Sequence, residues 1–206
     1  ELVRFFNGVI IDKETLKIIC YTFDKCLEED NINENLFGKN IKIQPVYEGT
    51  LIRAYFYNNK WNLSTKKMIN AHNAKWASNK SFGDMFSEII GIDNLNNGTY
   101  FKNKDYCYSF LMGHVENNII QNSANYIIHL NTIDLVNNIE INLSENTITY
   151  DEKIKHINQY GHVEINMEKD TLIKHIQDIK NDTGLNEIGY MFINQDNEKQ
   201  KFMKNN

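Results

Sequence analysis

Residues 46–67 hold the side chains of this sequence that are best suited to phosphate or nucleotide chemistry. A tight Glu48-Gly49 sequence opens the segment, Arg53 follows, and Lys66 stands near its end. A carboxylate such as Glu48 can bind a ribose hydroxyl or a metal ion, and a guanidinium such as Arg53 can bind a phosphate. The alternatives are an exposed turn acid at Glu48 and an ion pair on a solvated sheet face at Arg53.

The same segment predicts a β-hairpin that would position these side chains. One apolar-rich strand is expected over residues 51–57 and a second over 60–65. The Asn58-Asn59 pair between them favours a two-residue turn, because Asn tolerates the positive φ that such turns require. The hairpin therefore carries Arg53 on its first strand and presents Lys66 directly after its second strand.

Apolar alternation elsewhere predicts more strands, and apolar residues at helical spacing predict helices. Strands are expected at 2–12, 17–21, 106–112, 125–135, 138–150, 161–167 and 190–193. A helix is expected between Ser81 and Gly91, because a Ser side chain can satisfy a free amide at a helix start. The clearest helix is 168–180, and a shorter one is expected at 151–159. The tail 194–206 is expected to fray.

The chain has 206 residues, which suits one large domain, and the sequence shows no repeat or linker. We therefore expect a single domain over 1–206, trimmed at its termini because it begins at Glu1 without Met. The net charge is -5, so the chain as a whole lacks the basic footprint of a nucleic-acid binder. Trp61 and Trp76 could stack a base or pack in a core. A local phosphate-binding patch, or simply a solvated face, could form from Lys60, Lys66, Lys67, Lys75 and Lys80.

The three cysteines, Cys20, Cys26 and Cys107, have spacings that match no zinc pattern. We interpret them as reduced thiols of an intracellular, cytoplasmic protein. The sequence contains no apolar run near the ~20 residues that span a bilayer, so no membrane partner is expected.

Several segments resemble motifs of the phage-type RNA ligases, a family of covalent nucleotidyltransferases, and they occur in the family's order. VYEGTLIRAYF resembles the nucleophile motif lysine-x-acid-glycine, with Val46 at the lysine position and Glu48-Gly49 retained. Lys66 in NLSTKK matches the basic residue of the next motif. Lys25 matches a lysine that contacts the nucleotide in the family.

Later segments resemble further motifs of the same family. In YSFLMGHVENNII, Leu111 stands where the family has an acid, whereas Glu116 and Asn117 match. In LNEIGYMF, Ile188 stands where the family has an acid, although the Gly-Tyr that follows is retained. A terminal Lys-x-Lys motif corresponds imperfectly to residues 201–204.

The resemblance implies an α+β fold of the RNA ligase-like nucleotidyltransferase type, with mostly antiparallel sheets and flanking helices. An active member would use a lysine amine to accept a nucleotide from ATP or GTP with Mg. Val46 has no lone pair, and Leu111 and Ile188 can bind neither a metal nor a sugar hydroxyl. These degenerate positions predict a site refilled with apolar groups, with no catalytic residue and no metal ligand left.

The leading hypothesis is a catalytically inactive domain with no certain cofactor, acting as a nucleotide- or RNA-binding or assembly module. A viral source and a protein partner would fit it. If a nucleotide pocket is retained, the resemblance assigns it Lys25, Glu48, Gly49, Arg53 and Lys66. One alternative is an active ATP-dependent RNA ligase or capping-type enzyme that uses another lysine, such as Lys42. A second alternative is a structural subunit of a virion or transcription complex.

Overall fold

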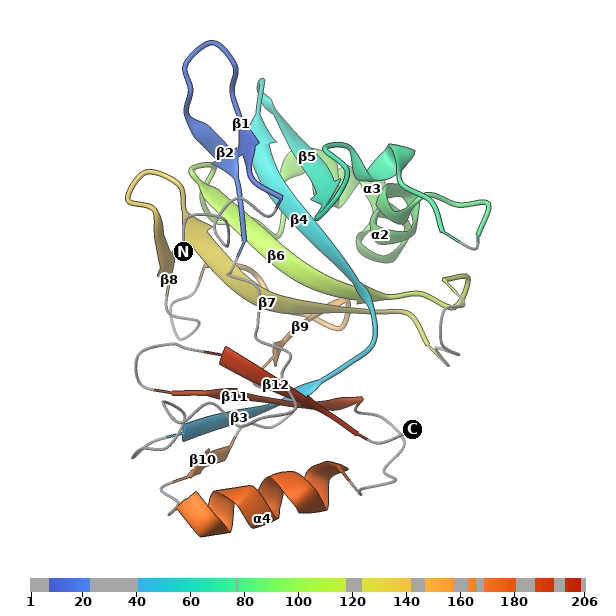
Figure 1. Cartoon of the computed structure of the whole chain (residues 1–206). Coiled ribbons are helices and arrows are strands. Elements are labelled where there is room, and N and C mark those ends of the chain that lie inside the picture. Colours follow the sequence, from blue (N-terminus) through green and yellow to red (C-terminus); the bar gives the residue numbers. More distant parts are fainter. Residues whose placement is uncertain are drawn as a thin grey trace. The chain divides into compact units, whose positions relative to one another are not determined.

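The structure is a computed structural model that describes residues 8–22, 41–76, 78–117, 124–141, 147–157, 163–165, 169–180, 188–194 and 199–204. The chain forms two compact units, each built of strands with helices (Figure 1). Unit 1 comprises Glu1–Asp24 and Gly49–Ile157, and unit 2 comprises Lys25–Glu48 and Asn158–Asn206. The fold is therefore of the α+β class. The single domain over 1–206 stays a prediction.

Unit 1 is built on a six-stranded sheet in the order β5-β4-β6-β7-β8, with β9 pairing in parallel to β7. Its strands are β4 (Thr50–Tyr57), β5 (Lys60–Thr65), β6 (Tyr106–Gly113), β7 (Tyr126–Asp134), β8 (Ile139–Ile141) and β9 (Ile154–His156). The predicted hairpin is confirmed: β4 and β5 are antiparallel, and Asn58 and Asn59 have φ values of 52° and 60°. A separate small hairpin pairs β1 (Ile10–Ile11) with β2 (Ile18–Cys20).

Helices cover one face of this sheet, beside β4 and β5 (Figure 1). They are η2 (Ala71–Asn73), α2 (Phe82–Ile90) and α3 (Ile92–Asn97). The predicted helix start is confirmed, because Ser81 Oγ accepts the Asp84 N–H at 3.0 Å. The helix ends at Gly91, as predicted. Aromatic side chains fill the space beneath the helices; Phe86 and Phe110 are fully buried, with ring centroids 5.4 Å apart.

Unit 2 is built on a four-stranded antiparallel sheet in the order β10-β3-β11-β12, with α4 packed against β11 and β12. The elements are β3 (Ile41–Val46), β10 (Val163–Ile165), α4 (Lys169–Lys180), β11 (Gly189–Ile193) and β12 (Lys199–Met203). Strand alternation places Ile43, Phe192 and Phe202 on one face, which is buried. The opposite face carries Lys42, Val46 and Lys201.

Two predicted elements are wrong and a third is too long, because strand pairing decided what the local pattern could not. Of the strand expected at 138–150, Ile139–Ile141 forms β8, whereas residues 147–150 contain only an isolated bridge at Ile148. Residues 154–156, within the expected short helix, form β9 and pair with β7. Residues 199–203, within the expected fraying tail, form β12 and pair with β11. Phe202 anchors β12, because its ring packs edge-on against Phe192 with a centroid separation of 5.1 Å. The helix predicted at 168–180 is confirmed as α4.

A buried histidine in β7 provides a test of how unit 1 is packed. His129 Nδ1 accepts the Tyr150 hydroxyl at 2.7 Å, and Nε2 donates to the Asn131 carbonyl at 2.9 Å. This network satisfies the neutral ring. Burial lowers the pKa of His129 to about 3, far below its ordinary value of 6.5.

We expect unfolding stability to depend on pH through His129. Because the pKa of His129 is depressed in the folded state, its contribution to the free energy of unfolding is fully present above pH 6.5. That contribution is lost as the pH falls toward 3. Each pH unit in that window should cost about 1.4 kcal/mol from this group. Urea unfolding from pH 7 to pH 4 should give a shallower decline for His129→Gln than for the wild type. Parallel declines of the unfolding free energy with pH in the two proteins would contradict the role of His129.

Candidate functional site

Three positions assigned to different motifs lie next to one another in the sheet of unit 2. The Val46 carbonyl accepts the Ile188 N–H at 2.8 Å, and the Ile188 carbonyl accepts the Lys204 N–H at 3.0 Å. Val46 also stands opposite Gly189 in the β3–β11 ladder. The assigned lysine position, the assigned acid position and the terminal lysine motif therefore meet at one end of the strands, where β3 and β12 finish and β11 begins.

The strand register shows which side chains lie on the same face of the sheet as Val46. Val46 shares its face with Lys42 and Lys201, and Ile188 precedes the first residue of β11. Lys42 is four residues from Val46, about 13 Å along the strand. Reacting atoms must come within about 3–3.5 Å. Lys42 therefore cannot simply replace an amine at position 46.

The retained glycine of the nucleophile motif makes a close contact in unit 1. A Cβ at Gly49 would come within 2.8 Å of Leu111 Cγ and 2.9 Å of the Met112 carbonyl oxygen, so a larger residue does not fit. Directly after it, Thr50 Oγ1 accepts a hydrogen bond from Asn117 Nδ2 at 2.9 Å. Gly49 and Thr50, in the segment that resembles the nucleophile motif, thus contact Leu111 and Asn117, which were assigned to a later motif.

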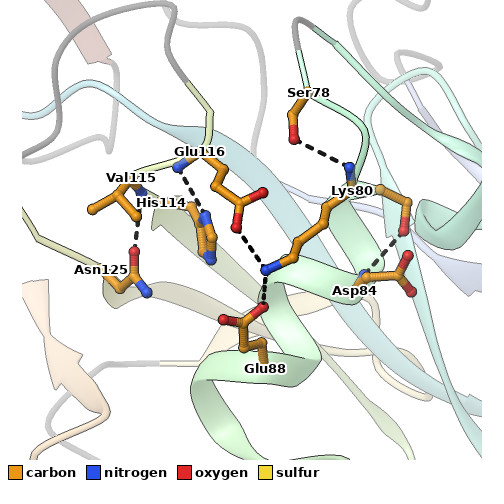
Figure 2. Close-up of polar contacts among 9 residues, drawn as sticks. Ser78, Lys80, Asp84, Glu88, His114, Val115, Glu116 and Asn125 are labelled. Atoms are coloured by element: carbon orange, nitrogen blue, oxygen red, sulfur yellow. Dashed lines mark hydrogen bonds and ion pairs between the residues drawn. The ribbon is translucent and has the colours of Figure 1, made fainter.

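The loop that follows β6 contains buried polar atoms around these contacts. His114 Nδ1 accepts the Glu116 N–H at 3.1 Å (Figure 2). The Asn117 N–H donates to the His114 carbonyl at 2.9 Å. His114 Nε2 and Asn117 Oδ1 are buried without a hydrogen-bond partner. Buried polar atoms of this kind are normally paired, so ordered water is expected there.

Lys80 links this loop to helix α2. Its ammonium lies 2.6 Å from Glu116 Oε1 and 2.7 Å from Glu88 Oε2, between the two carboxylates (Figure 2). The hydrogen bonds that Lys80 donates to Glu116 and Glu88 raise the pKa of Lys80, and the bond from Lys80 lowers the pKa of Glu88. Two carboxylates neutralise this ammonium. Of the five lysines predicted as a basic cluster, Lys80 is therefore the least suited to bind phosphate.

Arg53 is held by backbone groups within unit 1. Only 1% of its surface is exposed, and its guanidinium donates to the carbonyls of Gly8 and Thr65, the latter at 2.6 Å. Its Nε is buried without a hydrogen-bond partner. These contacts tie the start of the described chain and the end of β5 to β4. A role of Arg53 in nucleotide binding stays a prediction.

The other predicted nucleotide residues are placed as follows. Glu48 is half-buried and stands between β3 and β4. Lys66 is half-buried in a turn after β5, where Thr65 Oγ1 accepts the Met68 N–H at 3.0 Å. Lys25 lies outside the described residues. Lys66 thus lies at the surface. The predicted nucleotide pocket stays a prediction.

The two tryptophans have different environments. Trp61 packs into the aromatic core of unit 1, with its ring centroid 4.2 Å from that of Phe101. Trp76 is 63% exposed, in the loop between η2 and α2. Lys67 and Lys75 in the same part of the chain are exposed as well. Residues 49–83 contain six Lys and Arg and no Asp or Glu, a local charge bias that the sequence analysis did not use.

Comparison with known proteins identifies relatives in viruses. The immediate-early protein ICP-46 homolog of Invertebrate iridescent virus 3 is 30% identical over 97 residues, which is 42% of this chain and 21% of that protein. Its counterpart from Invertebrate iridescent virus 6 is 40% identical over 50 residues, which is 24% of this chain and 11% of that protein. The chain thus spans about a fifth or less of these relatives. No family model matches the sequence.

Comparison of structures identifies the fold. The RNA ligase of Naegleria gruberi with PPi has a TM-score of 0.53 and 12% identity, with 95% of this chain and 61% of that chain covered. A mutant of the same ligase with ATP and Mn also has a TM-score of 0.53, at 11% identity, with 83% of this chain and 51% of that chain covered. The chain therefore has an RNA ligase-like fold.

The residues at the assigned acid positions do not suit a divalent metal. Mg and Mn prefer oxygen ligands, and Leu111 and Ile188 have no side-chain oxygen. Within the described ranges, no group of three or more His, Cys, Asp or Glu side chains is arranged to hold a metal ion.

Each helix that the structure describes is too short or too polar to cross a membrane.

Substitution of Arg53 tests whether its contacts stabilise unit 1. Arg53→Met removes the donors to the Gly8 and Thr65 carbonyls and should lower the free energy of unfolding by about 2–4 kcal/mol. Lys66→Met at the surface should change it by less than about 0.5 kcal/mol. Urea denaturation followed by circular dichroism measures both. Equal stabilities for the two variants would show that the Arg53 contacts contribute nothing.

Proposed function

We propose that this chain is a catalytically inactive, RNA ligase-like nucleotidyltransferase domain of viral origin that works as an RNA-binding module. The observation that carries the proposal is the aliphatic side chain of Val46 in the β3–β11 ladder. Its neighbour across the ladder is Gly189, and the next residue back, Ile188, hydrogen-bonds to the Val46 carbonyl. Covalent nucleotidyl transfer needs a nucleophile with a lone pair, which valine cannot supply.

The contacts around Gly49 support the same proposal. Leu111 fills the space beside Gly49 so closely that a methyl group would not fit there. Val46, Leu111 and Ile188 are each only partly buried, so these aliphatic side chains gain part of the stabilisation that full burial would give. Apolar residues at Val46, Leu111 and Ile188 are therefore consistent with a scaffold kept for binding after its chemistry was lost.

RNA binding is proposed from the surface around Trp76. An exposed indole can stack on a base of any identity, and exposed lysines such as Lys67 and Lys75 can bind the backbone phosphates. Residues 49–83 contain no acid, although Asp84 lies against His72 of η2 and the whole chain has a net charge of -5. We define the Trp76 surface as the exposed residues Trp76 and Lys75, adjacent in the chain, together with Lys67, a further exposed lysine of the same acid-free run. Activities and partners of a longer protein that carries this domain belong to the proposal as well.

A nucleotide-transfer assay tests the inactive state. Wild-type protein incubated with Mg and ATP or GTP labelled at the α-phosphate should carry no acid-stable, lysine-linked label. Val46→Lys, which restores an amine at that position, is the matched comparison. A label on the wild type that disappears in Lys42→Ala or Lys201→Ala would refute the proposal and identify a substitute nucleophile.

An RNA-binding assay tests the Trp76 surface. Fluorescence anisotropy with a labelled single-stranded RNA should show an affinity for the wild type that falls about 5- to 100-fold in Trp76→Ala, the range expected for the loss of one stacked base. Lys67→Gln and Lys75→Gln should weaken binding and reduce its salt dependence. Val136→Ala, at an exposed apolar residue elsewhere, is the control. Equal affinities for wild type and Trp76→Ala would argue instead for a protein partner at this surface.

A further inference from the structure

Two cysteines far apart in the sequence have their sulfur atoms in contact inside unit 1. Cys20 ends β2, Cys107 lies in β6, and their Sγ atoms are 3.5 Å apart. Both side chains are fully buried and both are free thiols. The Cys20 sulfur also lies 3.6 Å from Ser64 Oγ. Sequence spacing predicted separate reduced thiols, and the pairing of these two is decided by the fold.

From this geometry we propose that Cys20 and Cys107 are a modification site, at which a small disulfide oxidant converts the two thiols into an intramolecular disulfide. The sulfur atoms need to approach by about 1.5 Å to reach the length of a disulfide bond. The loop that would be closed joins residues separated by 87 positions in the sequence. The proposal is independent of RNA binding and of nucleotidyl transfer.

The surroundings of the pair make the two sulfurs unequal. Burial alone would raise the pKa of the Cys20 thiol, but the hydrogen bond from Cys107 and the positive charge of Arg53 outweigh it and lower that pKa. Burial raises the pKa of Cys107 well above its usual range, and its bond to Cys20 adds to the effect. Cys20 is therefore the first nucleophile, because the thiolate is the form that attacks a disulfide.

The reaction follows from ordinary thiol–disulfide exchange. The Cys20 thiolate attacks one sulfur of the oxidant, forms a mixed disulfide and releases the other half of the oxidant as a thiolate. Cys107 then loses its proton and displaces the second half. The protein loses two hydrogens and two electrons, and the oxidant is reduced to two thiols.

The oxidant can reach the pair because the covering segment is small. Cys20 is the last residue of a hairpin whose strands have only two and three residues. Polar contacts hold this segment on the sheet, including Thr22 Oγ1 to Ser109 Oγ at 2.7 Å and the Arg53 bond to the Gly8 carbonyl. Ile10 and Cys20 also pack with Tyr55, Cys107 and Ile133, so this small segment must open locally before an oxidant reaches the pair. Oxidation would therefore fasten residues 8–22 covalently to β6.

The test uses the full chain with Cys26→Ser, which leaves the two proposed partners as its thiols. After incubation with oxidised glutathione, mass spectrometry should show a loss of two hydrogens, and a peptic digest should contain the peptide pair linked through Cys20 and Cys107. The melting temperature of the oxidised protein should rise by roughly 10 °C, because a long loop is closed in the unfolded chain. Reduction with dithiothreitol should reverse both changes.

Single-cysteine variants supply the control. In the Cys26→Ser background, Cys20→Ser and Cys107→Ser should each give at most one glutathione adduct and no rise in melting temperature. Iodoacetamide labelling of the starting protein establishes that the thiols are reached within the time of the experiment. Separate glutathione adducts on both cysteines, or labelling of both without any cross-link after oxidation, would overturn the proposal.

Discussion

The close packing at Gly49 is the constraint that fixes the start of β4 in unit 1. Residues 47–49 join the last residue of β3, in the sheet of unit 2, to the first residue of β4, in the sheet of unit 1. The last of the three, Gly49, has Leu111 and Met112 so close that no side chain fits. Its successor, Thr50, is held by the Asn117 amide. Sequence and backbone packing together therefore leave little freedom for residues 49 and 50.

The chemistry of each unit near this connection follows from the side chains that stand there. In unit 2, Val46 and Ile188 are neighbours through a backbone hydrogen bond. In unit 1, Leu111 packs against Gly49. Each of these aliphatic groups is compatible with burial and unable to bind a phosphate, a metal or a sugar. The RNA ligase-like fold is thus present together with aliphatic side chains at the positions that the resemblance assigns to a nucleophile and two acids.

Several polar groups of unit 1 make contacts that hold the unit together. Arg53 and His129 are both almost fully buried, and each is held mainly by backbone carbonyls or hydroxyl groups within the unit. Cys20 and Cys107 meet between the small hairpin and β6. At the surface, Lys80 forms ion pairs with Glu88 and Glu116. The Trp76 surface, in contrast, keeps its cationic and aromatic groups exposed.

Local sequence determined the elements whose signals are complete within a few residues. The Asn58-Asn59 turn, the Ser81 cap and helix α4 were predictable because turn geometry, capping and apolar spacing act over one or two turns of chain. The same holds for the lack of an amine at position 46, since that depends on residue type alone. Motif order also predicted the RNA ligase-like fold.

Only the tertiary structure decided which distant residues meet. Strands β9 and β12 exist through pairing with β7 and β11, an interaction that their own short sequences do not encode. Burial separated Trp61 from Trp76 and brought Cys20 to Cys107, although each pair is identical in type. The physical reason is that burial and partner choice depend on contacts across the sheet, whereas propensity depends on the nearest neighbours in the chain.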